Sequence, residues 1–129
     1  MDSWQIARQR PGRKIKQRRI YVSLNRRGEI ALNERAFREI GQPASVTLLY
    51  DVKTRTIGIK YPVVMDRHFF PARRYGRGRR MRIVRAARML KQFGIEVDAT
   101  LVFPNVEVKA YGREPMLVFS LEDGKKVSS

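Results

Sequence analysis

Cysteine is absent from the 129 residues, and histidine occurs once, at His68. Disulfide bonds and thiolate metal sites are therefore excluded, and a single imidazole is too few for a histidine-based metal centre. No stretch approaches the roughly 20 consecutive apolar residues of a membrane-spanning helix. The N-terminus also lacks the apolar core of a secretion signal. We therefore expect a cytoplasmic protein with no cofactor and no membrane segment.

Acidic residues are also scarce. Lysine and arginine total 28 against 12 aspartates and glutamates, which gives a formal net charge of +16. A charge of this size destabilises the compact state through self-repulsion and favours a polyanionic partner. Composition alone allows a nucleic acid or an anionic membrane surface, and a soluble basic protein with neither partner remains the alternative.

No group of residues has the composition of a catalytic site. His68 has no nucleophile or carboxylate close to it in the sequence, as a catalytic base would need. The "GRG" of residues 76–78 lacks the lysine and hydroxyl residue of a phosphate-binding P-loop, so we interpret it as a turn. The glutamates are scattered and are better explained as partners of nearby arginines. We expect a protein that is not an enzyme.

The chain divides into five segments by charge and apolar pattern. Runs of charged residues with few apolar residues among them are typical of tails, whereas alternating apolar residues indicate strands. The predicted segments are a basic flexible arm (1–19), a first folded unit (20–61), a connection (62–68), a second folded unit (69–121) and a polar tail (122–129).

The first unit has a simple predicted order of elements. Alternating apolar residues predict strands over 20–24 and around 30–32, separated by a turn that includes Gly28. Asn33 is a suitable N-cap for a helix over 34–40, and Gly41 is placed to end that helix in the left-handed conformation. The apolar runs 46–50 and 56–61 then predict a hairpin.

The second unit repeats this pattern. A shift of 53 residues aligns Ile30 with Ile83, Phe37 with Leu90, Gly41 with Gly94, Leu48 with Leu101 and Tyr50 with Phe103. Self-similarity at a fixed spacing indicates a repeated structural unit. One unit is too small to bury its apolar face, whereas two units that interleave their hairpins can close a barrel without exposed edges. We therefore predict a mainly β protein with short helices (α+β), in which two internal repeats form one barrel.

The motifs of the first unit resemble those of a known family. The "I-x-L" strand, the short helix ending in "I-G" and the "V-x-L-x-Y…I-x-I-K" hairpin resemble the AbrB-type swapped-hairpin DNA-binding domain. The paired units resemble its two-unit, MraZ-like members. The resemblance implies DNA contacts from arginines at the first turn and on the helix. It matches the turn glycine at Gly28 and a helix arginine at Arg38, and it has Glu29 where an arginine is usual.

The densest positive charge lies in the second unit, in "RRYGRGRRMRIVRAARMLK" over residues 73–91, which has no acidic residue. Arginine binds phosphate through two parallel hydrogen bonds, and the glycines let the backbone approach it. We expect a helix on which Arg85, Arg88 and Lys91 share one face, with Ala86, Met89, Leu90 and Phe93 packed inward.

Together these features predict a DNA-binding transcriptional regulator or architectural protein, nucleoid-associated in the cytoplasm, with DNA favoured over RNA. An RNA-binding or ribonucleoprotein component is the alternative, as is an antitoxin-like protein-interaction subunit; a homodimer or a protein partner is also compatible. The predicted nucleic-acid-binding residues are Arg26, Arg27, Arg35, Arg38, Arg73, Arg74, Arg77, Arg79, Arg80, Arg82, Arg85, Arg88 and Lys91, with Arg13, Lys14, Lys16, Arg18 and Arg19 in the arm.

Overall fold

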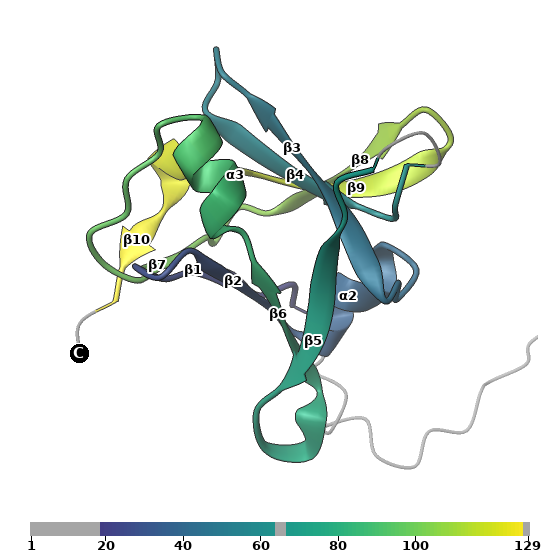
Figure 1. Cartoon of the computed structure of the whole chain (residues 1–129). Coiled ribbons are helices and arrows are strands. Elements are labelled where there is room, and N and C mark those ends of the chain that lie inside the picture. The colour runs from purple at the N-terminus through teal and green to yellow at the C-terminus, as the bar shows by residue number, and fades with distance from the viewer. Residues whose placement is uncertain (1–18, 64–66, 128–129) are drawn as a thin grey trace, which may run out of the picture.

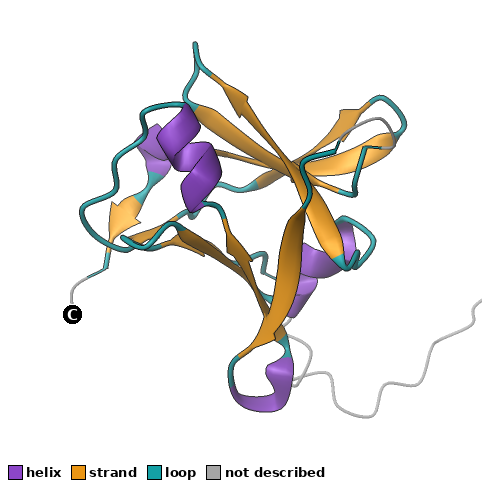
Figure 2. Ribbon diagram, in the orientation of Figure 1, coloured by secondary structure: helices purple, strands orange, loops and turns teal. Residues whose placement is uncertain are grey.

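The computed structural model describes residues 19–63 and 67–127 (Figure 1). In that part of the chain, ten strands form one antiparallel sheet in the order β10-β7-β1-β2-β6-β5-β3-β4-β9-β8. Figure 2 distinguishes these strands from the two short α-helices. The expectation of a mainly β protein with short helices is confirmed.

The first unit contains four strands and one helix. They are β1 (Val22–Leu24), β2 (Glu29–Leu32), α2 (Glu34–Glu39), β3 (Ser45–Asp51) and β4 (Thr56–Lys60). The helix and the hairpin lie where the apolar pattern predicts them.

The second unit has the same order of elements, except that two separate strands follow its helix where the first unit has the single strand β3. Its elements are β5 (Phe70–Tyr75), η1 (Arg77–Arg79), β6 (Met81–Arg85), α3 (Ala87–Gln92), β7 (Leu101–Val102), β8 (Glu107–Tyr111) and β9 (Glu114–Ser120). The segment expected to be a polar tail adds η2 (Leu121–Asp123), which begins one residue before it, and β10 (Lys125–Lys126), which pairs with β7.

The two helices end in the same way. The Gly41 N–H donates to the Arg38 carbonyl (3.1 Å), and the Gly94 N–H donates to the Lys91 carbonyl (3.2 Å). Both glycines have positive φ, +86° and +67°, as the left-handed end of a helix requires. The alignment at 53 residues therefore pairs positions with equivalent backbone geometry.

The helix starts differ. Asn33 Oδ1 accepts from the Ala36 N–H (2.9 Å), which confirms the predicted N-cap. The same side chain accepts from the Tyr21 N–H (3.1 Å) and donates to the Arg19 carbonyl (2.7 Å). Ala86 occupies the equivalent position in the second unit, and its methyl side chain cannot accept a hydrogen bond to cap α3. Asn33 thus ties the start of the first unit to its helix.

The central ladder joins the two units. Strand β2 pairs with β6, so that Glu29 lies opposite Arg85 and Leu32 opposite Arg82. The 53-residue shift maps Glu29 onto Arg82 and Leu32 onto Arg85, so each strand contributes equivalent residues at opposite ends of the ladder. This is the pairing that a local two-fold axis produces.

Flanking strands of the two units also pair with each other. Strand β1 pairs with β7 of the second unit, and β5 pairs with β3 of the first. Strands β4 and β9 pair about Gly58 and Val118. Strand pairs between the two units therefore occur at several places in the sheet.

The core is built from both units. Buried side chains from the first unit include Leu24, Ile30 and Ile59, and those from the second include Phe103 and Phe119, whose ring centroids lie 4.6 Å apart. Lys60 is also buried at 1% exposure, with its ammonium group bonded to the Glu114 carboxylate and the Tyr61 carbonyl. The buried charge is therefore both ion-paired and hydrogen-bonded, as buried charges in proteins generally are.

The described helices are too short to cross a membrane.

We predict that Gly28→Ala destabilises the fold because Gly28 has φ +82°, and an added Cβ would lie 2.8 Å from the Ala87 Cα. The strained φ and the overpacking should together lower the free energy of unfolding by about 2–4 kcal/mol. Gly112→Ala is the matched control, since Gly112 also has positive φ (+65°) but open space around it. Urea unfolding that gives equal losses for the two variants would contradict this packing.

Candidate nucleic-acid interface

The β5–β6 hairpin projects from the rest of the fold and ends in the teal loop of Figure 1. In the first unit, five residues (25–29) separate the paired Leu24 and Ile30. In the second, nine residues (74–82) separate the paired Arg73 and Ile83. Because Ile30 aligns with Ile83, the second hairpin is four residues longer, and the extra length contains the arginine-rich tip.

The tip is ordered by its own backbone. Gly76, Gly78 and Arg79 all have positive φ, and the Arg79 N–H donates to the Gly76 carbonyl (3.0 Å). The Arg82 guanidinium donates to the carbonyls of Arg79 (3.0 Å) and Met81 (3.2 Å). Two glycines with positive φ therefore allow a compact turn that holds neighbouring arginines at the end of the hairpin.

Most arginines of the hairpin are exposed and carry no counter-charge. Among the described residues, no ion pair involves Arg73, Arg74, Arg77, Arg79 or Arg80, and all five are exposed. Like charges at this spacing repel one another. Binding of a polyanion would relieve that repulsion.

Arg82 differs from its neighbours. Its guanidinium carbon lies 4.7 Å from the centre of the Phe37 ring, and it sits opposite Arg74 in the ladder. Burial, followed by the charge of Arg74, lowers the pKa of Arg82, while Glu34 acts in the opposite direction. Arg82 therefore supports the hairpin against α2, besides adding charge.

Each hairpin turn faces the helix of the other unit. One crevice lies between the first turn and α3 and includes Arg26, Arg27 and Lys91. The second lies between the arginine-rich tip and α2 and includes Phe37 and Arg79. The helix residues are equivalent under the 53-residue shift, since Phe37 in one crevice corresponds to Leu90 in the other. The two crevices are thus related, and the second is richer in arginine.

A direct backbone hydrogen bond holds the first turn against the start of α3. The Ala86 N–H donates to the Gly28 carbonyl (2.8 Å). Asn25 Oδ1 accepts from the N–H groups of Arg27 (2.9 Å) and Glu29 (3.0 Å). These bonds fix the turn and leave the side chains of Arg26 and Arg27 exposed.

The remaining predicted nucleic-acid-binding residues differ in ion pairing and in exposure. Arg35 and Arg38 are paired with Glu39 (2.9 Å) and Glu34 (3.3 Å) on α2. Lys91 is exposed and lines the first crevice, and Arg19 is exposed at the start of the described chain. The other predicted arm residues, Arg13, Lys14, Lys16 and Arg18, lie outside the described residues.

The expectation that Arg85 shares a helix face with Arg88 is wrong. Arg85 belongs to β6, opposite Glu29 at 4.0 Å, and α3 begins only at Ala87. The ladder with β2 and the bond from Ala86 to Gly28 keep this part of the chain extended. Arg88 is on the helix and lies over the Phe70 ring at 5.2 Å.

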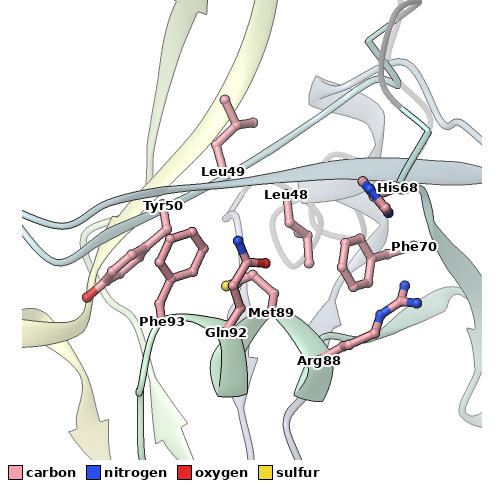
Figure 3. Close-up of a pocket in the computed structure, with 9 residues that line it drawn as sticks. All are labelled: Leu48, Leu49, Tyr50, His68, Phe70, Arg88, Met89, Gln92 and Phe93. Carbon is pink, nitrogen blue, oxygen red and sulfur yellow. The ribbon is translucent and has the colours of Figure 1, made fainter.

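A partly apolar cleft lies between β3 and α3 (Figure 3). The rings of Tyr50 and Phe93 are in tilted contact at one end, with centroids 4.9 Å apart, and His68 and Arg88 lie at the other. Phe93, expected to pack inward, remains 38% exposed. The sequence pattern missed this cleft because it arises from tertiary packing between distant elements.

No cluster of three potential metal ligands occurs among the residues that the structure describes. Comparison of the chain with protein-family models, with curated proteins and with solved structures finds no match.

We predict that Arg82→Ala lowers the free energy of unfolding by about 1 kcal/mol, through loss of the ring contact and two hydrogen bonds. Arg80→Ala should change it by less than about 0.5 kcal/mol because its side chain is exposed. Thermal or urea unfolding of both variants provides the measurement. Equal stability of the two variants would show that Arg82 does not support the hairpin.

Proposed function

We propose that this chain is a non-enzymatic nucleic-acid-binding protein that favours duplex DNA and acts as a transcriptional regulator or architectural binder. One observation carries the proposal: the extended β5–β6 hairpin presents five exposed arginines with no ion-pair partner among the described residues. Such a group favours a phosphate polymer over a single small anion because its charge is spread along β5 and the tip of the hairpin. This function implies a nucleoid-associated protein in the cytoplasm.

The shape of the hairpin favours DNA over RNA. The major groove of B-form DNA admits a two-stranded ribbon, whereas the deep major groove of A-form RNA is too narrow for side chains to read. Arginines at the tip would bind phosphates through paired hydrogen bonds. The positive φ of Gly76 and Gly78 lets the backbone approach a phosphate without a side chain in the way.

At the level of the fold, we propose an AbrB-like barrel made of two internal repeats with exchanged hairpins. The symmetric ladders of β2 with β6 and of β4 with β9 support it, as do the equivalent helix ends at Gly41 and Gly94. Strands β7 and β8 are separated only by residues 103–106, and they pair with β1 and β9 respectively. A bend at that point would close the ring of strands.

An approximate two-fold axis suits a duplex, whose backbone has two-fold symmetry of its own. The first crevice then supplies a second, weaker set of phosphate contacts from Arg26, Arg27 and Lys91. The first crevice would position the chain through these contacts, and the arginine-rich hairpin would supply most of the charge.

The test is the salt dependence of binding to a duplex. We predict that replacing Arg77, Arg79 and Arg80 together by alanine lowers affinity and reduces the slope of log K against log salt by about 2–3 units. Each lost phosphate contact removes about 0.9. Fluorescence anisotropy at several salt concentrations measures both quantities.

The matched control replaces Lys53, Arg55 and Arg113 by alanine. This removes the same charge from the β3–β4 and β8–β9 turns. Equal slopes for the two triple variants would show that net charge, and not the hairpin, determines binding. Competition between duplex DNA and structured RNA at one salt concentration separates the DNA proposal from an RNA-binding role. A stable heterocomplex that survives nuclease would instead favour a protein-interaction subunit.

A further inference from the structure

Strand β8 forms one end of the sheet. It pairs with β9 on one side, and none of the described residues pairs with its other side. All five residues of β8 are exposed. Figure 1 shows the β8–β9 hairpin at the side of the molecule opposite β10. An exposed edge of this length is a template for pairing with another strand.

Some backbone N–H and C=O groups of β8 are directed away from β9. Gly112 and Arg113 form a two-residue turn between the paired Tyr111 and Glu114. In an antiparallel ladder, bonded and non-bonded pairs alternate, so the backbone groups of Val108 and Ala110 are directed away from β9. Pro115, opposite Ala110, has no N–H to offer, which agrees with this alternation.

The side chains of β8 match those of a second copy. Glu107 and Lys109 lie on one face of the strand, with Lys109 Nζ 3.4 Å from Glu107 Oε1. If two β8 strands pair antiparallel about Val108, Glu107 of each copy lies opposite Lys109 of the other. The four charges then alternate in sign around a square, and opposite-charge pairs across strands are attractive.

The same register is favoured on the other face. It places the exposed Val108 (40% exposed) opposite its equivalent, and Ala110 opposite Val106. A register centred on Lys109 would place two lysines together, and one centred on Glu107 would place two glutamates together. Of these three registers, only the one centred on Val108 places Glu107 directly opposite Lys109.

The strand at the other end of the sheet is unsuited to self-pairing. Strand β10 consists of Lys125 and Lys126, so self-pairing would bring lysines together, a common means of blocking an edge. We propose that the outer edge of β8 is a self-association surface, which pairs antiparallel with β8 of a second copy and joins two sheets into one. This inference is independent of nucleic-acid binding.

Sedimentation equilibrium of the full chain without nucleic acid tests the pairing. We expect concentration-dependent dimers of the unaltered chain. Glu107→Lys and Lys109→Glu, each alone, should raise the dimer dissociation constant about tenfold or more, because two attractive contacts become repulsive. The double variant Glu107→Lys/Lys109→Glu should restore the original value, because the alternation of charge is regained.

Two further variants complete the experiment. Lys125→Glu changes the other edge and should leave the dissociation constant unchanged. Val108→Pro removes an outward N–H and should abolish the dimer while thermal unfolding reports whether the fold is retained. A chain that stays monomeric at all concentrations would overturn the proposal. So would single charge variants that dimerise like the unaltered chain, or a double variant that does not recover.

Discussion

The pairing of β2 with β6 is the interaction on which the rest of the structure depends. It joins residues fifty or more positions apart, with Glu29 opposite Arg85 and Leu32 opposite Arg82. Neither unit has enough apolar surface to form a core by itself, and this ladder brings their buried faces together. It also sets the position of both hairpin turns, because each turn continues directly from one of the two central strands.

That arrangement explains the unequal use of charge in the two units. The first turn is short and is held by Asn25 and by the contact between Gly28 and Ala86, and α2 neutralises Arg35 and Arg38 internally. The second turn is four residues longer, and its exposed arginines have no ion-pair partner among the residues that the structure describes. The two units thus have similar backbones, but the turn of the first is tightly packed and the turn of the second presents exposed arginines.

Local features of the fold were predictable from the sequence, and features that depend on distant pairing were not. The cap at Asn33 and the helix ends at Gly41 and Gly94 follow from short-range backbone chemistry, which does not depend on the other unit. The start of α3 was misplaced because the ladder with β2 keeps Arg85 extended, which overrides local helix propensity. The cleft beside Phe93 depends on the position of a helix relative to a strand, and no local pattern encodes it.

The most direct test of the proposed DNA interface is nuclear magnetic resonance mapping of the backbone amides as duplex DNA is added. We expect shifts concentrated at residues 73–82, with weaker shifts at Arg26, Arg27 and Lys91, and none in the β8–β9 hairpin beyond those caused by self-association. Shifts confined to the cleft between β3 and α3, or no shifts at low salt, would contradict it.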